Sequence, residues 1–319
     1  KGSSPFLGTT VLGRRTSAPS SYGAGMHRWQ CRPLAAAGAL LATMAVGACA
    51  PAASQPSAPS LSPLPQQSGS APPSQSASTQ PTRVVVIVME NRAYDSVLGL
   101  PYIHSVSSAS TVLTNYHASG HPSLPNYLEL TSGTTWGISD DGYHVLPRQD
   151  IGDQLSASGV AWRAYMEGLG SDCRQSTGRY AVKHDPFAYY GGRCPSSVVP
   201  FSQLGTDLQG AAPPRFMWIT PDLCHDMHDC SGEVGDSWLQ RTVPLLLASP
   251  AMSNGIVFIT WDENDGGGSN QVLTLVLGAR RPTSPGSAYS HPALLATVED
   301  LLGLPRLPAT RTVAAIALH

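Results

Sequence analysis

The sequence predicts an α/β fold with a mostly parallel central sheet flanked by helices. The prediction starts from three short, uninterrupted apolar runs rich in β-branched and aromatic residues, which is typical of strands buried on both faces of a parallel sheet. The runs are residues 84–89, 216–220 and 255–261. Acidic residues follow each run, at Glu90, Asp222 and Asp262. Because ligands bind beyond the carboxyl ends of the strands in open α/β sheets, we expect a polar site at this edge.

The remaining elements alternate in the βα manner of a parallel sheet. Further strands are expected at 111–116, 160–165 and 271–277. Helices are expected at 124–132, 149–158, 235–248 and 291–302. The sequence contains no internal repeat, no heptad pattern, and no GxGxxG or P-loop motif. It therefore gives no support for a coiled coil or for a glycine-rich nucleotide site.

The front of the chain differs in composition from the rest. Residues 1–25 carry no periodic pattern and begin with Lys1, so we interpret them as a disordered upstream extension and Met26 as the true start. Residues 26–48 have the pattern of an export signal, with a positively charged start and an Ala-rich apolar stretch. That stretch is too short and too weak to be a good transmembrane helix.

The apolar stretch ends in Val46-Gly47-Ala48-Cys49, which resembles the lipobox of bacterial lipoproteins, where the cysteine is lipidated. The alternative is an ordinary secretory signal, and both interpretations predict export. Residues 50–82 are nearly all Pro, Ala, Ser and Gln and carry no charge, so we expect a disordered tether that cannot bury enough apolar surface to fold. The folded domain is expected at 83–319.

Charge and cysteine content narrow the possible partners. A formal net charge of −2 gives no electrostatic argument for nucleic-acid binding. The cysteines beyond the signal region are Cys173, Cys194, Cys224 and Cys230. In an exported protein an even number favours disulfides, and the simplest of the three pairings is local, Cys173 with Cys194 and Cys224 with Cys230. A zinc site is the rival, but the paired C-x2-C spacing is absent.

A serine and two clusters of polar residues carry the candidate chemistry. Ser123 stands between two prolines at a predicted helix start, where free backbone N–H groups suit an anion, although a simple N-cap is the alternative. No GxSxG motif marks it as an esterase nucleophile. The acids and histidines at 222–229 favour metal or phosphate chemistry over a solvated loop. The acids and glycines at 262–268 suit Mg²⁺, Ca²⁺ or a transition metal, with a surface turn as the alternative.

Six motifs together resemble the bacterial acid phosphatase and phospholipase C phosphoesterase family, and in particular its short secreted acid phosphatases. The motifs lie at residues 89–92, 121–128, 180–187, 221–229, 260–266 and 289–295. They cover nearly all of 83–319 in the family's order, so their combination is far more specific than any one of them. The resemblance implies an alkaline-phosphatase-like fold and makes 83–319 a phosphoesterase catalytic domain.

The resemblance also implies a role for each matched residue. One divalent metal ion of unknown identity would be held by Glu90, Asn91, Ser123, Asp262 and Glu263. Ser123 would be the nucleophile, and the other catalytic residues would be His184, Asp226 and His228. Substrate would be bound by Asn91, Lys183, His121 and His291. Asp222 stands where relatives usually have Asn, and Arg92 is expected to be structural.

The function expected from this resemblance is an exported, metal-dependent acid phosphatase that hydrolyses phosphate monoesters through a phosphoserine intermediate. Its substrate would be a phosphorylated small molecule or lipid headgroup, phosphoinositides included, and the membrane would be reached only through the lipid anchor. Two alternatives remain at this stage. One is a phospholipase C-type phosphodiesterase, and the other is a non-enzymatic lipoprotein that binds phosphate or metal.

Overall fold

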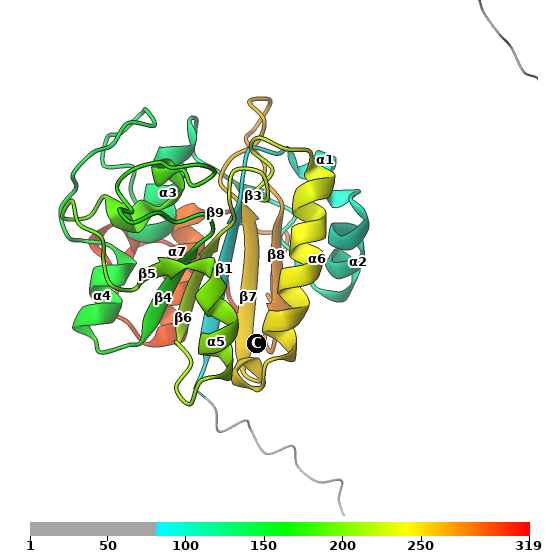
Figure 1. The fold of residues 1–319 in the computed structure, drawn as a ribbon. Coiled ribbons are helices and arrows are strands. Elements are labelled where there is room, and N and C mark those ends of the chain that lie inside the picture. The colour runs from blue at the N-terminus through cyan, green and yellow to red at the C-terminus, as the bar shows by residue number, and fades with distance from the viewer. Residues whose placement is uncertain (1–80) are drawn as a thin grey trace, which may run out of the picture. The chain divides into compact units, whose positions relative to one another are not determined.

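The computed structural model describes residues 81–319. The segments expected at 1–25 and 26–48 lie outside the described residues, as does 50–82 except for its last two residues. The described part of the chain forms a central seven-stranded sheet with helices on both faces (Figure 1). This arrangement confirms the predicted α/β fold with a mostly parallel sheet.

The central sheet has the strand order β2-β8-β7-β1-β6-β4-β5. Its strands are β1 (Arg83–Met89), β2 (Thr111–Val112), β4 (Trp162–Met166), β5 (Val198–Pro200), β6 (Phe216–Thr220), β7 (Gly255–Trp261) and β8 (Thr274–Gly278). Neighbours from β7 to β5 pair in parallel, whereas β8 pairs antiparallel with both β7 and β2. A small parallel sheet joins β3 (Tyr116–His117) to β9 (Tyr289–Ser290).

The helices form two groups. They are α1 (Tyr94–Leu98), α2 (Pro101–Ala109), α3 (Ser123–Ser132), α4 (Ile151–Ala157), α5 (Leu204–Gln209), α6 (Gly232–Ala248) and α7 (His291–Leu302). Helix α3 packs on α4 and α7, and α2 packs on α6. Figure 1 shows these two groups on opposite sides of the sheet. The sheet is thus covered on both faces, as its continuous apolar strands require.

The three central strands form the middle of the core. Every residue of β1, β6 and β7 is buried. Each fully buried Val or Ile side chain contributes roughly 1.5–3 kcal/mol relative to exposure, so these strands are held firmly in place. Because β7, β1 and β6 are direct neighbours, the polar residues that follow them start from adjacent points of one sheet edge.

The structure departs from the expected elements at several places. The strand expected at 111–116 is two short pieces, β2 and β3, which pair in different sheets. The strand expected at 271–277 is β8, which is shifted to Thr274–Gly278. Helices α1, α2 and α5 and strands β5 and β9 were not predicted, because they are short or rich in Ser and Gly and carry little periodic signal.

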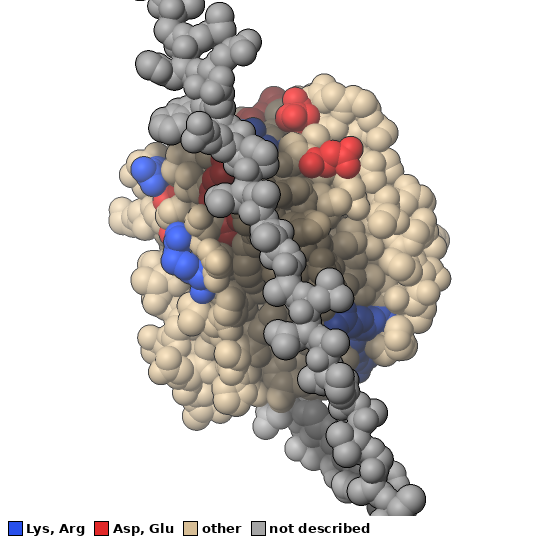
Figure 2. All heavy atoms as spheres, turned by 90° about the vertical axis from the view of Figure 1, so that its right-hand side faces the viewer, with Lys and Arg blue, Asp and Glu red and all other residues tan. Residues whose placement is uncertain are grey.

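The carboxyl edge of the sheet lies at the top in Figure 1. On the flank seen in Figure 2, the visible acidic side chains gather in the upper half. Among the described residues, no helix combines the length and the hydropathy needed to cross a bilayer. The expected site therefore has to be sought along this edge.

Candidate active site

Three carboxylates converge where β1 and β7 end. Glu90 follows β1, and Asp262 and Glu263 follow β7; their exposed fractions are 0%, 0% and 2%. Burial, together with the neighbouring Glu90 and Glu263 charges, raises the pKa of Asp262 well above its usual range. Burial raises the pKa of Glu263 in the same direction. Several buried acids so close together are unfavourable unless a positive charge offsets them.

Two buried oxygen atoms in this group lack a hydrogen-bond partner. They are Asn91 Oδ1 and Asp262 Oδ2. The backbone N–H of Asn91 donates to Asp262 Oδ1 (3.2 Å) and its side-chain amide donates to Glu263, so the amide oxygen is left free. Asn91 adopts a positive φ of 35°, a conformation that Asn tolerates better than most residues. Unpartnered hard oxygens beside buried carboxylates fit a divalent cation.

Ser123 is the first residue of α3 and points into the same group. Its hydroxyl lies 3.1 Å from Glu90 Oε2 and 3.4 Å from Glu263 Oε1, the two acceptors within its reach. The N-cap of α3 is Pro122, so the alternative interpretation of Ser123 as an N-cap is wrong. The serine instead stands at a helix N-terminus, where backbone donors and the helix dipole favour an anion. Its side chain is therefore placed to act as a nucleophile.

Helix α3 contributes two further side chains that the sequence analysis did not single out. Asn126 donates to Glu263 Oε2 (3.2 Å), and the Tyr127 hydroxyl donates to Glu90 Oε1. Both are fully buried. They lie three and four residues after Ser123, which is the spacing of one helix face. That spacing is the signal from which they could have been predicted.

His184 is enclosed between two acids. Its Nε2 lies 3.2 Å from Glu90 Oε2 and its Nδ1 lies 3.2 Å from Asp226 Oδ2. The ring stacks on Tyr127 with centroids 5.2 Å apart. Burial opposes the imidazolium charge, but the two carboxylates outweigh it and raise the pKa of His184 to about 10. In this arrangement Glu90 and Asp226 together favour the protonated form of His184.

His228 and Lys183 form the more accessible side of the site. Lys183 Nζ lies 3.4 Å from His228 Nε2, and His228 Nδ1 lies 2.7 Å from Asp229 Oδ1. The His228 side chain is 31% exposed, compared with 2% for His184. The two imidazole centroids are 5.6 Å apart. His228 is therefore open to solvent, whereas His184 is buried between two acids.

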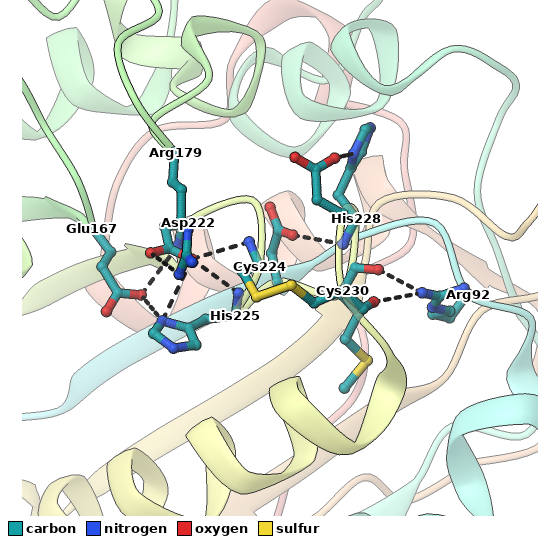
Figure 3. Close-up of a disulfide and its surroundings, with 11 residues drawn as sticks. Arg92, Glu167, Arg179, Asp222, Cys224, His225, His228 and Cys230 are labelled. Atoms are coloured by element: carbon teal, nitrogen blue, oxygen red, sulfur yellow. Dashed lines mark hydrogen bonds and ion pairs between the residues drawn. A yellow bond between two sulfur atoms is a disulfide. The ribbon is translucent and has the colours of Figure 1, made fainter.

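A disulfide shapes the loop that carries Asp226 and His228. The predicted pairings, Cys224–Cys230 and Cys173–Cys194, are both confirmed. Arg92, expected to be structural, donates to the backbone carbonyls of Met227 (2.7 Å) and Cys230 (2.8 Å) and so holds the loop from one side (Figure 3).

The same loop directs two of the predicted polar residues away from the site. His225 lies 2.9 Å from Glu167 and 3.5 Å from Asp222, with Arg179 3.8 Å from Asp222. Figure 3 shows this group on the far side of the disulfide from His228. Of the acids in the loop after β6, Asp226 is the one that contacts His184 at the site. Asp222 instead accepts the backbone N–H groups of Cys224 and His225 in its own turn.

Two predicted substrate-binding histidines occupy different positions. His121 pairs with Glu263 at 2.8 Å and is 42% exposed, so it borders the acid group. His291 is fully buried, with Nε2 2.6 Å from the Asp262 carbonyl oxygen and Nδ1 3.1 Å from the Tyr116 hydroxyl. Both ring nitrogens thus have partners within the protein, so neither is free for a substrate in this structure. Its position instead supports the backbone that presents Asp262.

A second set of side chains could hold a metal on geometry alone. Glu90, His184 and His228 each offer a ligand atom, and these atoms lie within 4.8 Å of one another. The set shares only Glu90 with the acid group. His184 Nε2, like Asn91 Oδ1 and Asp262 Oδ2, is a buried atom without a hydrogen-bond partner, although it lies 3.2 Å from Glu90 Oε2. Both sets therefore contain buried atoms that a cation could use, and they share Glu90.

The α/β fold described above resembles that of a solved structure. A putative sulfatase from Bacteroides thetaiotaomicron superimposes with a TM-score of 0.54, covering 74% of this chain and 73% of that chain at 13% identity. The sequence profile described as the phosphoesterase family matches residues 100–305, and the chain belongs to that family. The resemblance seen in the motifs is confirmed.

Two relatives show how far the similarity extends. The chain is 33% identical to the phosphatidylinositol-3-phosphatase of Mycobacterium tuberculosis, over 72% of this chain and 80% of that one. It is 28% identical to an acid phosphatase of Aspergillus fumigatus, over 70% of this chain. The match spans only 56% of that fungal protein's length.

Proposed function

We propose that the protein is a metal-dependent acid phosphatase that hydrolyses phosphate monoesters through a phosphoserine intermediate. The observation that carries the proposal is the position of Ser123. It is the first residue of helix α3, and its hydroxyl donates to Glu90 within a buried acid group. A nucleophile, an anion-binding helix end and a set of hard oxygens then share one site. The acid phosphatases among the relatives support the same reaction.

In the first step, Ser123 Oγ attacks phosphorus, forming a new P–O bond while the bond to the alcohol breaks. The serine proton is directed toward Glu90 Oε2, the acceptor of its hydrogen bond. Lys183 and the N-terminus of α3 offset the negative charge on the phosphoryl oxygens. His228 gives a proton to the departing alkoxide, since its ring is partly open to solvent and lies beside Lys183.

In the second step, water attacks the phosphoserine from the side that the alcohol has left. His228 now takes a proton from that water, the bond between phosphorus and Ser123 Oγ breaks, and Glu90 returns the proton to the serine oxygen as phosphate is released. A divalent cation held by Glu90, Asn91, Asp262 and Glu263, with Ser123, would supply Lewis-acid stabilisation of the developing charge. His184 holds the side chains of Glu90 and Asp226 in position through its two 3.2 Å contacts.

The substrate class follows from the same site. A phosphate monoester offers the dianion that Lys183 and the helix end are arranged to bind, and a phosphoinositide headgroup is one such ester. The name of the mycobacterial relative supports this choice. A phospholipase C-type phosphodiesterase would need the same nucleophile, and a non-enzymatic binding protein would need only the acids and donors.

Export and a lipid anchor at Cys49 belong to the same proposal. The two disulfides support it, because disulfides persist in oxidising compartments. Replacing Cys49 with Ala should move the protein from the membrane fraction to the medium while activity is kept. Unchanged partitioning would remove the anchor from the proposal without affecting the catalytic part.

The catalytic proposal is tested by hydrolysis of p-nitrophenyl phosphate across pH, with and without EDTA, beside bis-p-nitrophenyl phosphate. We expect monoester turnover in acid that EDTA abolishes. Acid quenching followed by mass spectrometry should find a phosphate on Ser123. Preferred turnover of the diester would favour the phosphodiesterase, and binding of phosphate without turnover would favour the non-enzymatic protein.

A further inference from the structure

Asp141 is a carboxylate at the active site that neither the motifs nor the proposed mechanism uses. It lies in the segment between α3 and α4. Its Oδ1 accepts the backbone N–H of Leu124 at 3.0 Å, and its Oδ2 accepts Lys183 Nζ at 2.9 Å. The side chains of Asp141 and Lys183 are 33% and 19% exposed, so the pair lies at the accessible side of the site.

The two donors that Asp141 holds are those that a phosphoryl group on Ser123 would need. Leu124 directly follows Ser123, and its N–H points out of the first turn of α3. Pro125 has no N–H. The Leu124 N–H, which has no partner within the helix, is therefore the final backbone donor that this helix end can offer to a ligand. Lys183 is partly exposed, so its ammonium group can donate to a phosphoryl oxygen from the solvent side of the site. One carboxylate therefore bridges both anion donors.

We infer that Asp141 is a built-in mimic of the substrate's phosphoryl oxygens, which occupies their donors in the free protein and is displaced when a phosphate monoester binds. The inference rests on the proposed function, since it takes Ser123 as the point of attack. A carboxylate and a phosphoryl group both present two oxygens to N–H donors, so one can replace the other. Asp141 thereby limits how tightly the free protein binds any anion that needs these two donors.

The displacement has a direct consequence for affinity. A ligand that uses these two donors must outcompete a carboxylate that is already in place. Asp141 thus keeps Lys183 and the Leu124 N–H occupied until such a ligand binds. The observed affinity for an anion is the intrinsic affinity multiplied by the fraction of molecules in which Asp141 has released the two donors.

A plain capping role is the competing explanation. Asp141 would then only satisfy the Leu124 N–H, and removing its charge would leave phosphate binding unchanged or weaker. Asp141→Asn separates the two explanations, because the amide oxygen can still accept that N–H while the charge that holds Lys183 is lost. The neighbouring Asp140 supplies a matched control, since it is exposed and contacts only Gly142 and His144 among the described residues.

The experiment measures equilibrium binding of inorganic phosphate to the full chain by calorimetry, and its inhibition constant against p-nitrophenyl phosphate. We expect Asp141→Asn to bind phosphate about tenfold more tightly than wild type, as expected if the donors are free in about a tenth of the wild-type molecules. KM should fall by a similar factor while kcat stays within about twofold. Asp140→Asn should match wild type.

Phosphate affinity in Asp141→Asn that is equal to or weaker than in wild type would overturn the inference. If Asp141→Asn does not fold, Asp141→Ser offers another neutral acceptor to the Leu124 N–H and is judged by the same criterion. The two proposals can fail separately. Wild-type turnover without tighter binding in the variant rejects the mimic alone, whereas tighter binding in a protein that never turns over rejects the phosphatase and leaves the mimic standing.

Discussion

The Ser123 hydroxyl donates to Glu90 Oε2 at 3.1 Å, joining the first residue of α3 to the residue that follows β1. The two residues are 33 positions apart, and both are almost fully buried. Glu90 also contacts His184 and Tyr127, so the position of the serine is determined by a group of side chains from three segments. The nucleophile is therefore held in place before any substrate binds.

Ser123→Ala should abolish turnover without removing the site. The acids that would hold a cation keep their positions, because Glu90 and Glu263 have other partners. We expect kcat to fall by at least about a thousandfold while phosphate binding changes little, as for other covalent nucleophiles. Ser119→Ala, an exposed serine bonded to Glu129, is the control. Near wild-type turnover in Ser123→Ala would replace the phosphoserine route with direct attack by water.

Asp262→Asn should separate metal binding from folding stability. The variant removes one buried negative charge but keeps an oxygen that can accept the Asn91 N–H. The metal-free protein should become more stable, because burial and the charges of Glu90 and Glu263 disfavour the ionised form of Asp262. Metal content measured by mass spectrometry, and turnover, should both fall. The proposal of a cation site at the acids would be rejected if the purified variant had normal metal content and its metal-stripped form were less stable than that of wild type.

His228→Ala should act mainly on substrates with poor leaving groups. A p-nitrophenolate ion is a weak base and leaves without being protonated, whereas an alkoxide is a strong base and needs a proton to leave. We expect a loss of about a hundredfold for an alkyl phosphate and less than about tenfold for p-nitrophenyl phosphate. His225→Ala provides the control, since His225 lies in the same loop but contacts Glu167 and Asp222. Equal losses on both substrates would assign the proton to another group.

The parts of the fold that could be predicted are those whose signal is local. Strands β1, β6 and β7 follow from continuous apolar runs, and α7 begins and ends as predicted, from 291 to 302. Helix α2 was missed, because its Ser-rich sequence is stabilised by packing on α6 rather than by its own periodicity. Its backbone also depends on Asp236, which accepts the N–H groups of Tyr102 and Ile103 across 134 and 133 positions.

The same distinction applies to the site. Glu90 and Asp262 were predictable, because a buried strand that ends in an acid delivers it to a defined edge. Asp141 was not, because its partners Leu124 and Lys183 lie 17 and 42 positions away and no local pattern connects them. His291 was expected at the substrate and instead lies behind Asp262, because the start of α7 is covered by Tyr116. A motif identifies a residue but not the direction of its side chain.

Asp185 should make the protein less stable as pH rises. The residue is fully buried, and burial raises the pKa of its carboxyl group to about 7. Tyr180 has one hydroxyl hydrogen but lies 2.6 Å from the Cys173 carbonyl and 2.8 Å from Asp185 Oδ2. If that hydrogen goes to Cys173, a protonated Asp185 can donate to the Tyr180 oxygen. The neutral acid is therefore the form that the native state favours.

The sign of the pH effect follows from this. Between about pH 4 and pH 7 the native state binds the Asp185 proton and the unfolded state does not, so the contribution of Asp185 to stability decreases as pH rises. Asp185→Asn should remove that decrease, with a gain at pH 8 relative to pH 5 of at most about 4 kcal/mol. Urea unfolding of both proteins at the two pH values measures it. A variant whose stability changes with pH as wild type does would show that Asp185 is ionised in the native state.

The two disulfides should affect stability and activity in different proportions. Cys173–Cys194 spans 21 positions and encloses Lys183 and His184, while Cys224–Cys230 spans 6 and encloses Asp226 and His228. In the chain-entropy description the longer loop contributes about 3 kcal/mol and the shorter about 2 kcal/mol. Replacing each pair by serines should therefore cost more stability for the longer loop.

Activity should follow the opposite order. His184 is held by Glu90, Asp226 and the Tyr127 ring, so it can keep its place when Cys173–Cys194 is removed. His228 is partly exposed, and its loop depends on the disulfide and on Arg92. Replacing Cys224 and Cys230 should lower turnover of alkyl phosphates about tenfold or more, in the manner of His228→Ala. Urea unfolding and parallel assays on alkyl and aryl esters test both orders, and a shorter-loop variant with full alkyl phosphatase activity would show that Arg92 alone positions His228.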